Sequence, residues 1–183
     1  MCSTPFCCWA TRRCVSLTKP LRLLEGKMPT ILVICTANQC RSPMAEALLR
    51  KRLADAGYAD WRVESAGTQA HNGIPATDKS VQVMREYGLD ISQHRSREVT
   101  ADMLARADLV LTMTSGHKEA LLVEFAEARG KTFMLSEMSG FPVEIADPVG
   151  QSLERYRETA RDIDMFIRNG LSAIIEHAKG HAQ

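Results

Sequence analysis

From Met28 onward the chain alternates short apolar runs with segments that have helical spacing, and this alternation limits the fold more than any other feature. The first run, Ile31-Leu32-Val33-Ile34, is continuously apolar, as in a parallel strand that is buried on both faces. Alternating strands and helices pack as a parallel sheet with helices on both faces. We therefore predict an α/β three-layer sandwich with a parallel sheet of about four strands, formed by a single domain over residues 28–183. The strands are expected at residues 31–34, 61–65, 109–113 and 132–135.

Helices are expected where apolar residues recur every three or four positions. In the first helix, residues 44–53, Ser42 suits the N-cap and Pro43 suits the first turn, where no N–H partner is needed. Gly170 is expected to weaken or kink the last helix. The remaining helices are predicted at residues 78–87, 103–105, 117–129 and 152–177.

Residues 1–27 show no periodicity and differ from the rest of the chain in composition. They lack a secretory apolar region, although their arginines and near-absence of acidic residues weakly resemble an organelle transit peptide. We expect either a disordered extension or a mis-assigned start, with translation beginning at Met28. Four of the six cysteines lie in this segment, but the adjacent Cys7-Cys8 pair and the lack of a second ligand pair do not suit a metal site.

Charge and cysteine usage exclude several classes of protein. The net charge is +1, and the first 27 residues hold five basic residues against Glu25 alone, so the remaining residues sum to −3. That balance argues against a nucleic-acid-binding surface. No apolar run approaches the ~20 residues that span a bilayer. Only Cys35 and Cys40 follow residue 14, which fits a reducing cytoplasm better than a secreted disulfide scaffold.

The segment Cys35 to Ser42 lies between the first predicted strand and the first predicted helix, where α/β sheets bind ligands. Backbone N–H groups of a loop that leads into a helix can converge on phosphate oxygens, and the helix dipole favours an anion. Arg41 adds a planar cation that can bind two phosphate oxygens. The same positive field favours the thiolate of Cys35, which is the nucleophilic form. We therefore predict a phosphate-binding loop in which Cys35 is the nucleophile and Ser42 can donate a hydrogen bond to it.

The pair Cys35 and Arg41 also has other interpretations. A cysteine and an arginine separated by five residues occur often by chance, so Cys35 could be a buried strand-end residue and Arg41 a surface residue. The position directly after a strand and before a Ser-Pro helix start favours the phosphate loop. A zinc site is disfavoured because no second cysteine pair or His-x-x-x-His follows.

The run from Val33 to Glu46, VICTANQCRSPMAE, resembles the signature of low-molecular-weight protein tyrosine phosphatases, and the resemblance extends over residues 30–178. It implies a flavodoxin-like fold, no cofactor or metal, and a phosphorylated protein as substrate. Residues 64–68 and the Ala146-Asp147-Pro148 segment are similar to two further motifs of that family. Ala37 departs from it, since the family usually has Gly there, and Ala requires a negative φ or some strain. The resemblance implies that the substrate-binding loop consists of Thr36, Ala37, Asn38, Gln39, Cys40 and Ser42.

Cleavage of a phosphomonoester by a thiolate requires an acid for the leaving oxygen, and Asp147 is the best candidate. An Asp-Pro is more often only a turn, and the resemblance is what favours the acid. The resemblance also implies that Asn38, Ser65 and His94 brace the loop. His71, His117, His177 and His181 receive no chemical role from their spacing.

The substrate is left open by the sequence. Tyrosine phosphatases of the family typically place aromatic residues after Asp-Pro, whereas Val149-Gly150 follows here. Asp-Pro-x-Gly resembles the bacterial protein-arginine phosphatase branch instead, yet that branch favours Thr where Gln39 stands. Phosphotyrosine and phosphoarginine therefore both remain candidate substrates.

The same loop is compatible with other functions. Cys40 either packs or forms a reversible disulfide with Cys35, as the resemblance implies. A thiol-dependent arsenate reductase of the same fold is disfavoured because no cysteine follows Cys40. A non-catalytic anion-binding module is disfavoured by the joint presence of Cys35, Arg41 and Asp147. The oligomeric state is not determined by the sequence.

Overall fold

The sheet has four strands that all run parallel, as the alternation of strands and helices predicted. The computed structural model describes residues 28–181. Their strands follow the order β2-β1-β3-β4, and every neighbouring pair is parallel. The strands are β1 (Thr30–Cys35), β2 (Arg62–Gly67), β3 (Leu109–Thr112) and β4 (Thr132–Met134).

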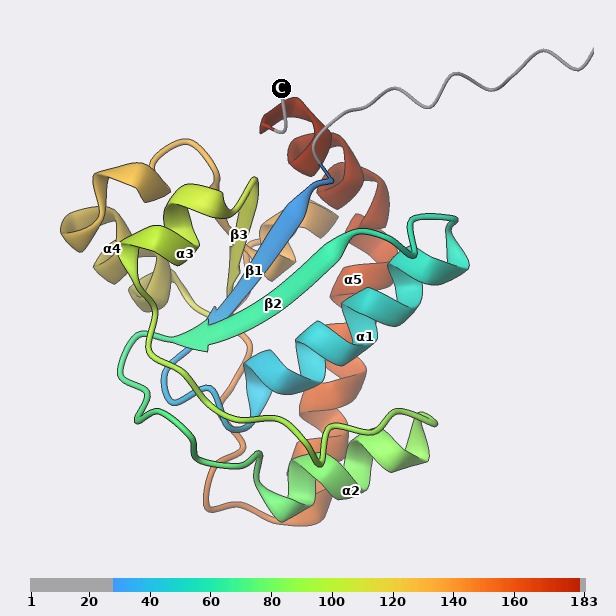
Figure 1. Ribbon diagram of the computed structural model, residues 1–183. Helices are drawn as coiled ribbons and strands as arrows, with labels where there is room; N and C mark the ends of the chain where they lie inside the picture. The colour runs from blue at the N-terminus through green and yellow to red at the C-terminus, as the bar shows by residue number, and fades with distance from the viewer. Residues whose placement is uncertain (1–27, 182–183) are drawn as a thin grey trace, which may run out of the picture.

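Helices cover both faces of this sheet, which confirms the predicted three layers (Figure 1). One face carries α1 and α5, with α2 packed against both, and the opposite face carries α3 and α4. Two 3-10 turns, η1 (Ala126–Ala128) and η2 (Leu135–Ser139), flank β4. The helices are α1 (Arg41–Asp55), α2 (Asp78–Glu86), α3 (Ala101–Arg106), α4 (Ser115–Glu124) and α5 (Leu153–His181).

The apolar run of β1 is continuous because the strand is covered on both faces. Ile31 and Val33 belong to the core on the side of α1 and α5, and Leu32 and Ile34 belong to the core on the side of α3 and α4. All four side chains are at most 1% exposed. Successive residues of a strand point to opposite faces, so a central strand needs apolar residues at every position.

Two helices differ from their predicted form. The helix expected over residues 117–129 begins at Ser115 and ends at Glu124, and its last predicted turn is the separate η1. Helix α5 continues through Gly170, where a weakened turn was predicted. A Cβ on Gly170 would lie 2.7 Å from Cβ of Met138, so this glycine allows η2 to pack closely on α5.

The predictions for residues 1–27 lie outside the residues that the structure describes. Within residues 28–181 no helix is both long enough and apolar enough to cross a membrane.

Candidate active site

The loop that joins β1 to α1 carries the residues to which the sequence assigned chemistry. Cys35 is the last residue of β1 and Arg41 is the first residue of α1, so the loop lies at a helix N-terminus, where N–H groups and the helix dipole favour anions. Ser42 was predicted to be the N-cap, and this is wrong: Cys40 occupies that position without a side-chain cap bond. The Ser42 hydroxyl instead lies 3.0 Å from Cys35 Sγ, inside the first turn, and so can stabilise a thiolate.

A cavity of about 170 Å³ opens above this loop. Asn38 and Ser42 do not line it, because both side chains are fully buried behind the loop. Val149 forms part of the wall and is 62% exposed, whereas no aromatic side chain contributes to the lining. The lining residues are Cys35, Thr36, Ala37, Gln39, Cys40, Arg41, Asp147 and Val149.

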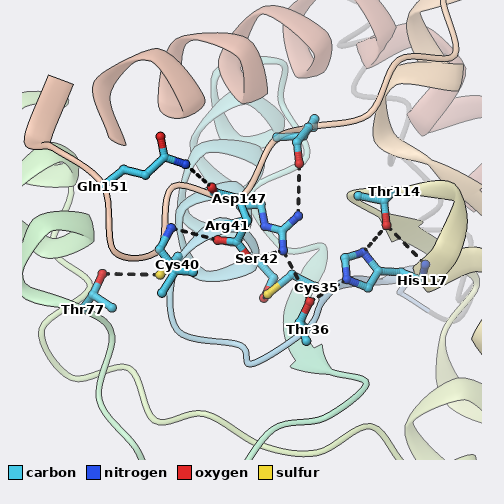
Figure 2. A network of polar contacts seen from close by, with 12 residues as sticks. Cys35, Thr36, Cys40, Arg41, Ser42, Thr77, Thr114, His117, Asp147 and Gln151 are labelled. Atoms are coloured by element: carbon cyan, nitrogen blue, oxygen red, sulfur yellow. Dashed lines mark hydrogen bonds and ion pairs between the residues drawn. The ribbon is translucent and has the colours of Figure 1, made fainter. Parts of the chain in front are cut away.

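Arg41 is only 4% exposed, and three hydrogen-bond partners orient its guanidinium (Figure 2). Nη1 donates to the carbonyl of Ile145 at 3.1 Å, and Nη2 donates to Thr36 Oγ1 at 3.4 Å. Nη2 also pairs with Oδ2 of Asp147. The buried Nε has no hydrogen-bond partner. A buried donor without a partner is costly, and a phosphate oxygen would satisfy this one.

Asn38 braces the loop from behind. Its Nδ2 donates to Ser42 Oγ and to Ser65 Oγ, both at 2.9 Å, and its Oδ1 accepts from the backbone N–H of Arg97 at 3.0 Å. Asn38 has φ 54°, and in residues 28–181 it is the one non-glycine residue with a positive φ. Asparagine tolerates that conformation better than most residues. Ala37 therefore avoids the left-handed region, and its replacement of the family's usual glycine causes no strain of that kind.

Ser65 and His94 extend this bracing to neighbouring segments. Ser65 Oγ donates to Glu46 Oε2 at 2.6 Å, so its oxygen remains free to accept from Asn38. His94 Nε2 donates to the carbonyl of Asn38 at 2.7 Å. Burial lowers the pKa of His94. Ser65 thus holds the side chain of Asn38, and His94 holds its backbone carbonyl.

Gly67, at the end of β2, allows the loop to pack directly on the sheet. A Cβ there would lie 2.3 Å from the carbonyl oxygen of Thr36. The next two residues donate backbone N–H groups to the loop: Thr68 to the carbonyl of Cys35 and Gln69 to that of Thr36, both at 3.0 Å. The end of β2 and the two residues that follow it thus shape the phosphate loop.

Asp147 reaches the cavity from the segment between η2 and α5. Its Oδ1 accepts from the N–H of Val149 at 3.1 Å, and its carbonyl accepts from Gln151 Nε2 at 2.8 Å. The Asp147 side chain is 37% exposed, in contrast to the buried Arg41 with which it pairs. An acid that is partly exposed at the rim can face the leaving group of a bound substrate.

Cys40 and Cys35 are both free thiols. Cys40 Sγ lies 3.6 Å from Thr77 Oγ1 and 3.5 Å from the hydroxyl of Tyr156. Burial raises the pKa of Tyr156 to about 12, so its hydroxyl is protonated at neutral pH. The reversible Cys35–Cys40 disulfide stays a prediction.

His117 also belongs to this site, although its spacing along the chain indicated no role for it. It lies in the first turn of α4, and its Nε2 is 2.9 Å from Thr36 Oγ1 (Figure 2). The two residues are 81 positions apart, and only the adjacency of β1 and β3 brings them together. No local pattern in the sequence could have indicated this contact.

The comparisons with known proteins agree with this geometry. Residues 30–179 match the family model described as "Low molecular weight phosphotyrosine protein phosphatase". A probable low-molecular-weight protein-tyrosine-phosphatase, EpsP, of Ralstonia nicotianae is 42% identical over 79% of this chain and 92% of its own. A protein-arginine-phosphatase of Geobacillus stearothermophilus is 39% identical over 75% of this chain and 90% of its own.

Solved structures show the same likeness. A low-molecular-weight protein tyrosine phosphatase from T. tengcongensis has a TM-score of 0.75 and 38% identity, over 79% of this chain and 99% of that one. A mutant of the YwlE arginine phosphatase, with a phosphorylated serine in place of the active-site cysteine, has a TM-score of 0.75 and 33% identity. That comparison covers 80% of this chain and 95% of the mutant's.

Proposed function

Because the chain belongs to the low-molecular-weight phosphotyrosine protein phosphatase family, we propose that it removes phosphoryl groups from phosphorylated side chains of proteins through a phosphocysteine. One observation carries this proposal: Cys35, Arg41 and Asp147 line the same small cavity at the N-terminus of α1. A nucleophile, a phosphate-binding cation and an acid are the groups that the reaction requires.

In the first step, Cys35 Sγ attacks phosphorus, and the bond from phosphorus to the leaving atom breaks as the S–P bond forms. Arg41 and the loop N–H groups stabilise the charge on the phosphoryl oxygens. Asp147, which takes up a proton when its pair with Arg41 breaks, donates that proton to the leaving atom. The Ser42 hydroxyl at 3.0 Å stabilises the thiolate before attack.

In the second step, water attacks the phosphocysteine, Asp147 accepts a proton from that water, and the Cys35 thiolate and inorganic phosphate are released. The phosphorylated serine of the YwlE mutant supports a covalent intermediate at the position of the nucleophile. The reaction needs a free thiol, so we place the enzyme in a reducing compartment such as the cytoplasm.

Phosphotyrosine and phosphoarginine are the two candidate substrates, and relatives named for each are present among the most similar proteins. Gln39 and Val149 line the cavity, and we expect their side chains to set the preference between these two substrates. The amide oxygen of Gln39 can accept from the N–H groups of a phosphorylated guanidine. Val149 offers a small apolar surface to a phenyl ring.

The experiment that tests the proposal measures phosphate release from matched phosphotyrosine and phosphoarginine peptides by wild type, Cys35→Ser and Gln39→Thr. We expect the wild type to turn over at least one peptide and Cys35→Ser to turn over neither. Although the Gln39 amide can also bind a guanidine, Gln39→Thr is expected to shift the preference toward phosphoarginine, because Thr is the residue that the protein-arginine phosphatase branch favours at this position. If the wild type released phosphate from neither peptide, or Cys35→Ser remained active, the proposal would be wrong.

A further inference from the structure

His117 is a buried histidine held between two hydroxyl groups at the edge of the active site. Its Nε2 lies 2.9 Å from Thr36 Oγ1, and its Nδ1 lies 2.9 Å from Thr114 Oγ1. Thr114 is the N-cap of α4, and its Oγ1 also accepts the backbone N–H of His117 at 3.3 Å. The ring is thus fixed at both nitrogens and faces the phosphate loop (Figure 2).

This imidazole is neutral at physiological pH. Burial, followed by the positive charge of Arg41, lowers the pKa of His117 to about 4, although Asp147 and Glu144 act in the opposite direction. A neutral ring has one donor and one acceptor nitrogen. In either tautomer it makes one hydrogen bond to the Thr36 hydroxyl, and Thr36 Oγ1 keeps a lone pair for Arg41.

Thr36 matters because it is one of only a few protein groups that orient Arg41. The pair with Asp147 must break when a phosphoryl group binds Arg41 and the acid turns to the leaving group. The remaining partners of the two Nη atoms are then the Ile145 carbonyl at 3.1 Å and Thr36 Oγ1 at 3.4 Å. These two bonds lie on different nitrogens, so together they fix the plane of the guanidinium.

We propose that His117 is a positioning residue of this enzyme, which acts through the Thr36 hydroxyl to hold the Arg41 guanidinium in the plane that binds the transferred phosphoryl group. The inference rests on the proposed function, because it assigns a phosphoryl group to Arg41. His117 transfers no proton and touches no reacting atom. Its effect is on the binding of the transition state and of inorganic phosphate, which resembles the phosphoryl group.

The test compares His117→Leu, which removes both hydrogen bonds, with His117→Gln, whose Nε2 can reach the Thr36 hydroxyl. With para-nitrophenyl phosphate, we expect kcat/KM to fall by about tenfold or more in His117→Leu, since small misplacements in an active site cost up to about 10²-fold. His117→Gln is expected to recover most of the loss. The affinity for inorganic phosphate, measured by calorimetry, should weaken in His117→Leu and recover in His117→Gln. A matched control is His177→Leu, because His177 packs on Phe133 and touches none of the cavity residues.

A double-mutant cycle with Thr36→Val tests whether the effect passes through Thr36. If it does, His117→Leu should cost little once the Thr36 hydroxyl is absent, so the two losses should not multiply. Losses that multiply, or an unchanged kcat/KM and phosphate affinity in His117→Leu, would overturn the inference. If His117→Leu does not fold, Thr36→Val and Thr36→Ser are compared, because only the serine variant keeps the hydroxyl that joins His117 to Arg41. Equal activity in those two variants would overturn the inference. If the wild type binds inorganic phosphate but turns over no substrate, the proposed function alone is refuted. The comparison of phosphate affinity between the wild type and the His117 variants then still tests the role of His117.

Discussion

The two sides of the active site differ sharply in how firmly they are held. The phosphate loop, residues 35–41, lies against the end of β2 and is braced by the buried network around Asn38. The segment from Phe141 to Ser152 has no helix or strand, and Phe141, Val143 and Val149 are 71%, 54% and 62% exposed. We call this segment the acid loop because it carries Asp147.

This difference follows from what each side has to do. In the proposed mechanism the phosphate loop stabilises charge that develops on fixed oxygens, and such stabilisation is strongest when the donors are already in place. Asp147, by contrast, pairs with Arg41, and in the proposed mechanism it must turn to the leaving group. A partly exposed loop can make that change at low cost, and variation in its sequence can change the substrate without altering the nucleophile.

The largest effect is expected for a substitution in the acid loop that lowers turnover without weakening phosphate binding. Asp147→Asn should lower kcat by about 10²- to 10⁴-fold, because the leaving group is then not protonated. Inorganic phosphate should bind at least as tightly as in the wild type, because Arg41 loses its competing carboxylate. Steady-state kinetics and calorimetry measure the two quantities, and near-wild-type turnover would remove Asp147 from the mechanism.

A substitution beneath the phosphate loop should impair both properties. In Gly67→Ala the new Cβ would collide with the Thr36 carbonyl, so the loop must shift. We expect a loss in kcat/KM of about 10²-fold, with weaker binding of inorganic phosphate. Gly180→Ala is the control, because nothing lies within 4 Å of a Cβ at that position. Intact phosphate affinity in Gly67→Ala would contradict the rigid role of the phosphate loop.

A smaller effect is expected where the acid loop faces the substrate. Val149→Tyr adds an aromatic wall that can stack on a phenyl ring, a contact of about 0.5–1.5 kcal/mol. The kcat/KM for a phosphotyrosine peptide should rise about two- to tenfold relative to that for a phosphoarginine peptide. Parallel assays on the two peptides give this ratio. A ratio equal to that of the wild type would show that Val149 does not contact the substrate.

The smallest effect concerns stability rather than turnover. The folded-state pKa of His117, about 4, lies below its ordinary value of 6.5, so between these values the unfolded chain binds a proton that the folded chain does not. Acidification through this window therefore favours unfolding. The melting temperature should fall more between pH 7 and pH 5 for the wild type than for His117→Gln. An equal fall would show that the buried imidazole does not titrate as described.

Much of the fold and part of the site could be predicted from local patterns. The apolar run of β1 gave a central strand because a strand covered on both faces requires apolar residues throughout. The spacing of Cys35 and Arg41 between that strand and a helix start gave the phosphate loop. Local patterns predicted the helix ends less well. The helix predicted to reach Arg129 ends at Glu124, and the chain continues as η1, because tertiary packing can override local helix propensity. The N-cap assignment of Ser42 failed because the helix already begins at Arg41, and the Ser42 hydroxyl lies against the Cys35 thiol instead.

By itself, the sequence determined the layers of the fold and placed Cys35 and Arg41 in one loop between a strand and a helix, because these features depend on residues that are close together along the chain. Only the tertiary structure decided that Asp147 pairs with Arg41 across 106 positions, that Gly67 lies beneath Thr36, and that His117 faces the same threonine from α4. These contacts join segments whose separation along the chain carries no periodic signal. They exist because parallel strands bring their carboxyl ends to one edge of the sheet.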